Sequence, residues 1–325
     1  MSDTTESQSA MPMMGTRAAW TDMPQRVRNA IEAWIGSPVV RADSQAGGFS
    51  PGVAAVVHTA DGRRFFVKTA APELNPDTPG FHRREAIIAA ALPENAPVPR
   101  LLWTYDEGED GWIVLVYEAI EGRNPRTPWN AAELDRVVDA LVALSDALTP
   151  SPVSEAIAGR ARDVSLFARP KWWLMQRYPP DGIDDWFARN FNRLVELEER
   201  AREAVDGDSL IHIDMRADNM LITERGVVIV DWPHARIGAP WVDMLGMAPS
   251  VTLQGGPSPD EFLLRHPAAR AADPADINAA IAALAAYFTY QSFQPPPPGI
   301  PSVRAFQRAQ GEITRAWLAR RTGWD

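Results

Sequence analysis

The sequence predicts an α+β protein with two lobes, a small lobe rich in strands and a larger lobe that is mostly helical. Residues 39–117 hold short runs of apolar and β-branched residues separated by turn residues, with one helical stretch among them. Beyond the proline-containing segment 122–129, apolar residues recur mainly at helical spacing. We therefore expect a disordered tail over residues 1–17, a first lobe over 18–119 and a helical second lobe over 120–325.

The first lobe is expected to contain a hairpin of two strands. Val53–Thr59 and Arg64–Lys68 are the two strand-like runs, and the Asp61-Gly62 pair between them is typical of a tight turn. Around this hairpin the pattern predicts an amphipathic helix over Ala18–Ile35, a helix over Arg83–Leu92 and a strand over Trp112–Tyr117.

Helical periodicity dominates the second lobe. It predicts helices over residues 133–148, 161–178, 183–204, 260–265, 275–293 and 303–321. A hairpin interrupts them, in which Leu221-Ile222 and Val227–Val230 are joined by a short turn. Pro295–Pro298 is interpreted as a fixed break between two helices. In the basic last helix, Trp317 and Leu318 are expected to pack inward while the arginines face solvent.

The most informative segment is His212-Ile213-Asp214-Met215-Arg216-Ala217-Asp218-Asn219, followed by Asp231 at the end of the hairpin. Asp214 can accept the proton of a substrate hydroxyl, while Asn219 and Asp231 carry the oxygen ligands that Mg²⁺ prefers beside phosphates. The octapeptide alone is weak, because Asp and Asn also stabilise turns. The hairpin strengthens the interpretation, since it places Asn219 and Asp231 at neighbouring strand ends.

Three upstream features occur in the order that a phosphoryl-transfer site requires. A glycine-rich segment spans 47–52, Lys68 ends the strand Phe65–Lys68, and Glu85 lies in a good helix former. Each feature has an ordinary structural explanation on its own: a turn, a solvated lysine and an exposed helical acid. Their occurrence in this order with Asp214 and Asp231 favours a shared nucleotide site.

These residues make the chain resemble the aminoglycoside phosphotransferase and choline kinase-like family from about Val39 to about Asp243. The segment Asp231-Trp232, with Gly238-Ala239-Pro240 and Asp243 downstream, is its most specific part. The resemblance implies a bilobal protein kinase-like fold, ATP and Mg²⁺ as cofactors, and a small-molecule hydroxyl as the acceptor.

The resemblance also implies a role for each site residue. Asp214 would be the catalytic base, Asn219 and Asp231 would bind Mg²⁺, and Lys68 would contact the nucleotide phosphates while paired with Glu85. The other implied nucleotide-binding residues are Gly47, Gly48, Ser50 and Gly52 in the phosphate-covering loop, and the hinge residues Glu118 and Ile120, whose backbone would read adenine.

Two positions depart from the family pattern. Ile213 stands where a glycine usually follows the motif histidine, and Arg216 stands where a histidine is more common. Arg216 could stabilise charge on the transferred phosphate, or it could simply pair with Asp218. His212 is interpreted as a structural residue that braces the loop. The glycine-rich loop lacks a strict G-x-G-x-x-G pattern.

Composition limits the remaining classes of protein. Of the 325 residues, 46% are apolar, which is enough for a sizeable core. The absence of cysteine excludes disulfides and zinc–thiolate sites and suits a cytoplasmic protein. The net charge of -10 argues against nucleic acid as a partner, and no apolar run reaches the roughly 18 residues of a membrane span. The sequence leaves open whether the protein is a monomer or a dimer.

The acceptor is less defined than the reaction. Residues 181–208 hold nine acidic residues and four arginines, which indicates either a site for a cationic substrate or, as we favour, a solvated helix face with pairs such as Glu196–Arg200. Trp172 and Trp173 could stack on a sugar or a cation, although such tryptophans more often belong to the core.

Three functional classes follow from this pattern. The first is an ATP-dependent kinase for a small molecule such as an aminoglycoside, an amino sugar or a related metabolite or antibiotic. The second is a non-catalytic nucleotide-binding regulator, against which the presence of Lys68, Asp214 and Asp231 argues. The third is a protein kinase, which the missing Ala-Pro-Glu segment and the short distance from Asp231 to Gly238 disfavour.

Overall fold

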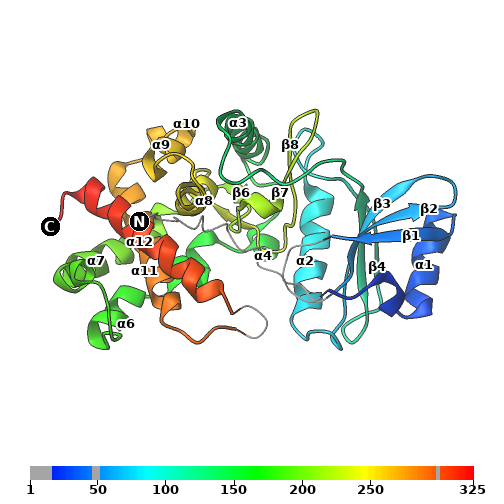
Figure 1. Ribbon diagram of the computed structural model, residues 1–325, viewed down its shortest axis with the longest axis horizontal. Coiled ribbons are helices and arrows are strands. Elements are labelled where there is room, and N and C mark those ends of the chain that lie inside the picture. Colours follow the sequence, from blue (N-terminus) through cyan, green and yellow to red (C-terminus); the bar gives the residue numbers. More distant parts are fainter. Residues whose placement is uncertain (1–16, 46–51, 298–300) are drawn as a thin grey trace, which may run out of the picture.

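The computed structural model describes residues 17–45, 52–297 and 301–325, and it consists of two lobes that lie side by side (Figure 1). The N-terminal lobe contains a five-stranded antiparallel sheet, and the C-terminal lobe is mostly helical with two small two-stranded sheets. The predicted α+β bilobal fold is therefore confirmed. Among the helices in these ranges, none is long and apolar enough to cross a membrane.

The N-terminal lobe contains the predicted helices and strands in the predicted order, together with two further strands, β1 and β4. Its elements are η1 Trp20–Asp22, α1 Gln25–Ile35, β1 Val39–Ser44, β2 Ala54–Thr59, β3 Arg64–Ala70, α2 Thr78–Ala91, β4 Leu101–Asp106 and β5 Ile113–Glu118, and the strands are ordered β1-β2-β3-β5-β4 in the sheet. The helix predicted to start at Ala18 starts at Gln25. The reason is Pro24, because the residue before a proline is kept out of the helical region and Pro24 itself is extended.

Both faces of this sheet are covered by helices. Val114 and Val116 of β5 belong to the apolar cluster that contains α1, whereas Leu115 and Tyr117 cluster with residues of α2. This alternation follows from the two-residue period of a strand. Lys68 of β3 is paired with Leu115, so its side chain emerges on the face that α2 covers.

The C-terminal lobe begins after a connecting segment. Its elements are α3 Ala131–Ala147, α4 Glu155–Ala158, η2 Ala161–Asp163, α5 Ser165–Ala168, α6 Lys171–Arg177, α7 Asp185–Ala204, β6 Ser209–Ile211, η3 Ala217–Asn219, β7 Met220–Ile222, β8 Val227–Ile229, β9 Arg236–Gly238, α8 Val242–Leu253, α9 Pro259–Leu263, α10 Pro267–Ala271, α11 Pro274–Ser292 and α12 Val303–Thr322. Trp317 and Leu318 of α12 are fully buried, as predicted.

One predicted helix of this lobe is wrong. Residues 161–178 form three short helices, η2, α5 and α6, in place of a single long one. Arg169 is extended because Pro170 follows it, and this ends α5. The elements α4, β6, β9, α8 and α10 were not predicted from the sequence. Of these, β9 pairs with β6 and α8 follows directly, so both lie next to the motif segment.

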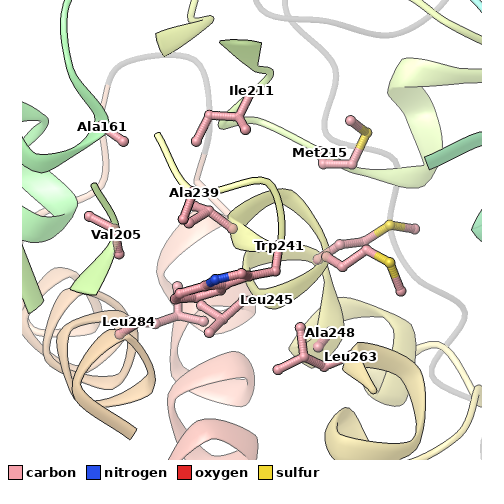
Figure 2. Packing of buried hydrophobic residues seen from close by; sticks show 14 of the residues in the cluster. Ala161, Val205, Ile211, Met215, Ala239, Trp241, Leu245, Ala248, Leu263 and Leu284 are labelled. Carbon is pink, nitrogen blue, oxygen red and sulfur yellow. The ribbon is translucent and has the colours of Figure 1, made fainter. Parts of the chain in front are cut away.

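The hydrophobic core of the C-terminal lobe packs against the motif segment, residues 212–219. Trp241 and Leu245 at the start of α8 pack with Leu284 of α11 and Leu263 of α9 (Figure 2). Met215, from the motif segment itself, belongs to the same cluster. Because these side chains are buried together, the motif segment is attached to the hydrophobic core of the C-terminal lobe.

Helix α2 lies between the sheet and the C-terminal lobe (Figure 1). Its Arg84 crosses to the C-terminal lobe, where Nε donates to the carbonyl of Ile157 at 3.1 Å and Nη2 donates to the carbonyls of Ala158 and Ala235. Three backbone acceptors from two segments therefore fix α2, which carries Glu85, against the C-terminal lobe.

Candidate active site

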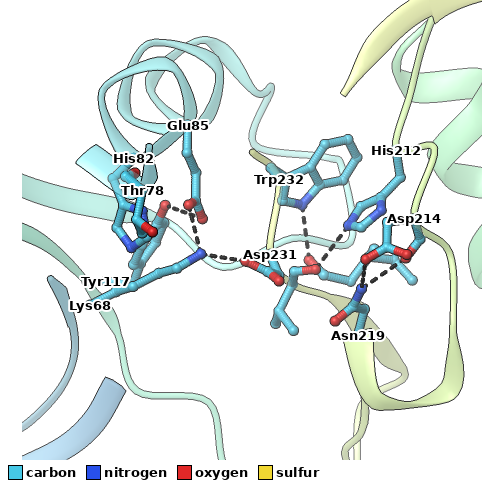
Figure 3. Close-up of polar contacts among 12 residues, drawn as sticks. Lys68, Thr78, His82, Glu85, Tyr117, His212, Asp214, Asn219, Asp231 and Trp232 are labelled. Carbon is cyan, nitrogen blue, oxygen red and sulfur yellow. Dashed lines mark hydrogen bonds and ion pairs between the residues drawn. The ribbon is translucent and has the colours of Figure 1, made fainter. Parts of the chain in front are cut away.

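The predicted hairpin brings three of the motif side chains together. Strands β7 and β8 are antiparallel, and beyond them the N–H of Val230 donates to the carbonyl of Asn219 at 3.0 Å. Asn219 Nδ2 in turn donates to the backbone oxygen of Asp214 at 2.8 Å and lies 3.4 Å from its carboxylate (Figure 3). Asp214, Asn219 and the residue after Val230, Asp231, thus surround one region of the molecule.

A buried carboxylate holds the start of the motif segment. Asp243 accepts hydrogen bonds from the N–H groups of His212 and Ile213, each at 2.8 Å. Burial raises the pKa of Asp243, and His212 together with these two hydrogen bonds opposes that shift. Ile213 has φ 72°, in the left-handed region that favours glycine. The departure from the family's glycine therefore coincides with backbone strain.

His212 connects the motif segment to the hairpin. Its Nε2 donates to the carbonyl of Val230 at 3.0 Å, and its ring makes an edge contact with Trp232, with ring centroids 4.9 Å apart. The histidine is fully buried, and its Nδ1 has no hydrogen-bond partner within the described ranges. This geometry agrees with the interpretation of His212 as a bracing residue.

Lys68 joins the two lobes through two carboxylates. Its Nζ donates to Glu85 Oε2 at 2.7 Å and also donates to Asp231, and Tyr117 donates to the other oxygen of Glu85 at 3.1 Å (Figure 3). Burial opposes the charge of Lys68, but Asp231 and Glu85 outweigh it and raise the pKa of the ammonium. Burial likewise opposes the charge of Asp231, and Lys68 outweighs it and lowers the pKa of this carboxyl.

Arg216 forms the predicted pair with Asp218. Its guanidinium pairs with Asp218 through contacts of 2.9 and 2.8 Å, and it also lies 3.5 Å from Asp214 Oδ1. Burial disfavours its charge, yet Asp214 and Asp218 together raise its pKa. Arg216 is therefore a paired cation beside the expected base.

The structure describes only some of the residues expected to form the phosphate loop and the hinge. Gly47, Gly48 and Ser50 lie outside the described residues. A Cβ on Gly52 would lie 1.7 Å from the carbonyl oxygen of Thr69, so the packing of this segment on the chain beyond Lys68 requires glycine.

The expected hinge residues lie at and just beyond the end of β5. Glu118 closes β5, with its N–H donating to Arg100 O at 3.1 Å and its Oε1 accepting from Arg100 N at 2.8 Å. Ile120 follows and is half-buried.

The donor set of this site fits a magnesium ion. Asn219 and Asp231 supply an amide and a carboxylate oxygen, and Asn219 Oδ1 accepts no hydrogen bond from the described residues. Within the same residues, no group of three or more His, Cys, Asp and Glu side chains is arranged to bind a metal. Two protein ligands suit Mg²⁺, which usually keeps several waters and phosphate oxygens.

Asp214 opens into a cavity of about 420 Å³ in the C-terminal lobe. The residues that line it are Val164, Ser165, Leu166, Ile213, Asp214, Met215, Arg216, His234, Arg236, Gly246, Ser250, Leu284, Tyr287, Phe288, Val303, Phe306, Gln307 and Gln310. Sequence reasoning identified Asp214 and Arg216 but missed His234 and Arg236. Their positions three and five residues after Asp231 were the available signal.

The acidic segment and the tryptophan pair do not belong to this cavity. No residue of 181–208 is among its described lining residues, and Arg200 pairs with Asp276 at 3.6 Å in place of the predicted Glu196. Trp172 is fully buried and donates to the carbonyl of Ala282 at 2.8 Å, whereas Trp173 is 49% exposed. Of the predicted alternatives, the solvated helix face agrees with the structure, and the core assignment is right for Trp172 but wrong for Trp173.

This fold and site define a protein of the kinase-like bilobal class, with a lysine–glutamate pair in one lobe and an Asp/Asn/Asp set in the other. The model of the phosphotransferase enzyme family matches residues 46–287. The chain belongs to this family. No match was found among curated protein sequences.

Solved structures confirm the fold. Aminoglycoside phosphotransferase APH(4)-Ia, in a complex with ADP and hygromycin B, is 15% identical with a TM-score of 0.58, covering 91% of this chain and 99% of its own. Spectinomycin phosphotransferase APH(9)-Ia, with ADP and spectinomycin, is 15% identical with a TM-score of 0.57, covering 92% and 99%. Choline kinase LicA from Streptococcus pneumoniae is 16% identical with a TM-score of 0.56, covering 90% and 98%.

Proposed function

We propose that this protein transfers the γ-phosphate of ATP to a hydroxyl group of a small molecule. The observation that supports the proposal most is the position of Asp214. It lies beside Asn219 and Arg216, and it opens into a cavity large enough for a small-molecule acceptor. The neighbouring phosphotransferases, whose structures contain ADP with hygromycin B or spectinomycin, support ATP as the donor and a small molecule as the acceptor.

In this proposal each residue acts mainly by position and charge. Asp214 orients the acceptor hydroxyl and takes its proton as the new phosphorus–oxygen bond forms. Lys68, held by Glu85, contacts the phosphates, and Arg216 stabilises charge on the transferred group. Mg²⁺, bound by Asn219 and Asp231, would neutralise the phosphate oxygens.

The remaining nucleotide contacts belong to the N-terminal lobe. Gly47, Gly48, Ser50 and Gly52 cover the phosphates. The backbone of the Glu118–Ile120 segment binds adenine at the junction of the two lobes.

The test is ATP consumption with Mg²⁺ in the presence of aminoglycosides, amino sugars, choline and cyclic peptide antibiotics. Asp214→Asn should lower turnover by roughly 10²- to 10⁴-fold, because the proton acceptor is lost, while the affinity for ATP stays close to that of the unmodified protein. Asp218→Asn is the comparison variant. It removes a nearby carboxylate that pairs with Arg216 and does not line the cavity, so turnover should fall much less than in Asp214→Asn.

The outcomes separate this proposal from a nucleotide-binding regulator. Phosphorylation of an acceptor that disappears in Asp214→Asn supports the kinase. Tight binding of Mg-ATP without any transfer, unchanged in Asp214→Asn, supports the regulator. An equal loss of ATP affinity and turnover in Asp214→Asn would contradict the role of Asp214 as base.

A further inference from the structure

The cavity beside Asp214 is mostly apolar. The apolar side chains that line it come from the start of α5, the motif segment, α11 and α12, and they are Val164, Leu166, Ile213, Met215, Leu284, Phe288, Val303 and Phe306. Among the described lining residues, Asp214 is the single acid, while Arg216 and Arg236 are both basic. These walls favour a ligand with an apolar body, since burying its apolar surface is favourable.

The charge of Arg216 is already balanced within the protein. It pairs with Asp218 at 2.8 Å and lies 3.5 Å from Asp214. His234 adds no positive charge near neutral pH, because burial lowers the pKa of its imidazole. Among the described lining residues, the remaining cation is therefore Arg236.

Arg236 stands at the start of β9, opposite Ile211 of β6. Its Nη1 donates to the carbonyls of His234 and Ala235 at 3.0 and 2.8 Å, which fixes the guanidinium at the cavity wall. Within the described ranges, Nε and Nη2 have no acceptor and no carboxylate forms an ion pair with this arginine. Burial lowers the pKa of Arg236, which means that its charge is partly desolvated. An anionic group of a ligand would compensate such a charge.

We propose that the acceptor of this phosphotransferase is a hydroxyl compound with an apolar body and one negatively charged group, such as a carboxylate, which binds Arg236. The inference rests on the proposed function, because it concerns the acceptor of the same site. A polycation is a poor fit. It would meet one acid and an uncompensated arginine, and it would have to lose its hydration against apolar walls.

Binding is tested by calorimetry in the presence of Mg²⁺ and AMP-PNP, so that no transfer is required. Three probes share one chain and one hydroxyl: 3-hydroxyoctanoate is anionic, 3-hydroxyoctanamide is neutral and 3-hydroxyoctylamine is cationic. We expect the acid to bind at least about 10-fold more tightly than the amide, and the amine to bind most weakly. 3-Hydroxybutyrate keeps the charge and the hydroxyl but has half the chain, and it should bind at least about 10-fold more weakly than 3-hydroxyoctanoate.

Variants assign the preference to Arg236. Arg236→Gln should make the acid and the amide bind equally, and Arg236→Lys should retain part of the difference. Arg162→Gln is the matched control, because Arg162 pairs with Asp206 and does not line the cavity. The affinity for Mg–AMP-PNP, measured in parallel, reports whether each variant is folded.

The inference is overturned if the amine or kanamycin binds more tightly than the acid, if none of the three probes binds, or if Arg236→Gln weakens AMP-PNP binding and leaves the acid unaffected. Turnover with ATP distinguishes this failure from failure of the proposed function. Binding of the acid without any phosphoryl transfer counts against the proposed function alone. Transfer to kanamycin or choline, unaffected by Arg236→Gln, supports the proposed function and overturns the inference about the acceptor.

Discussion

The N–H of Ile213 donates to Oδ1 of Asp243 at 2.8 Å, across a sequence separation of 30 residues. Ile213 adopts φ 72° at this point, so the hydrogen bond holds a β-branched residue in a conformation that it rarely takes. The residue after Ile213 is Asp214. The geometry of the expected base therefore depends on a carboxylate at the start of α8.

Asp243→Ala should destabilise the protein by roughly 2 to 5 kcal/mol, because two N–H groups in a buried environment lose their acceptor. Turnover should fall as well, since the segment that carries Asp214 is no longer held. Urea unfolding and ATP consumption measure the two effects. Asp243→Asn keeps one acceptor oxygen and serves as the intermediate control. A change of less than about 1 kcal/mol in Asp243→Ala would show that the contact is dispensable.

The Ile213→Gly variant should be more stable than the Ile213→Ala variant, whereas at most positions the alanine variant is the more stable of the two. Both substitutions remove the same packing, but alanine retains the left-handed strain of roughly 1 to 2 kcal/mol and glycine relieves it. We expect the free energy of unfolding, measured with urea, to be about 1 kcal/mol higher for Ile213→Gly than for Ile213→Ala. The same pair of substitutions at Val228, in strand β8, is the control and should follow the usual order. Equal free energies of unfolding for the two Ile213 variants would show that the backbone at this position is not strained.

Glu85→Gln should raise the Mg²⁺ concentration required for half-maximal activity. Without the charge of Glu85, Lys68 is drawn more strongly to Asp231, so it competes with the metal for that carboxylate. We expect kcat/KM for ATP to fall roughly 10- to 100-fold. Steady-state kinetics over a Mg²⁺ titration provide the measurement. Tyr117→Phe removes only the hydrogen bond to Glu85 and should have a smaller effect, and an unchanged Mg²⁺ requirement in Glu85→Gln would oppose this explanation.

Because of Glu198, the free energy of unfolding should decrease as the pH rises. Its side chain is 4% exposed, and burial raises its pKa to about 7, although hydrogen bonds from the N–H groups of Trp172 and Lys171 oppose the shift. Between the unfolded pKa of about 4.3 and about 7, the folded state binds more protons than the unfolded state, so stability decreases across that window. Above it the dependence flattens.

Glu198→Gln removes this titration. Between pH 4.5 and pH 8, the free energy of unfolding of the unmodified protein should fall by roughly 3 kcal/mol more than that of the variant. Urea unfolding at several pH values measures the difference. Glu203→Gln is the matched control on the same helix, because its side chain is exposed. Parallel pH profiles for the unmodified protein and Glu198→Gln would exclude the effect.

Local signals accounted for much of the fold. The Asp61-Gly62 turn and the strand pattern around it gave the β2–β3 hairpin, because turn residues act over only a few positions. The continuous helix predicted over 161–178 failed for the opposite reason. Its apolar spacing was helical, but Pro170 and the packing of short helices against α7 and α11 divided it.

The sequence by itself determined the order of the motif and the chemistry of its side chains. Asp214, Asn219 and Asp231 are close in sequence, and one hairpin suffices to bring them together. Only the tertiary structure decided what surrounds Asp214. The cavity draws its walls from residues between 164 and 310, and Arg236 reaches it through the pairing of β9 with β6. Such contacts depend on how distant segments pack, and no periodicity or spacing along the chain records that packing.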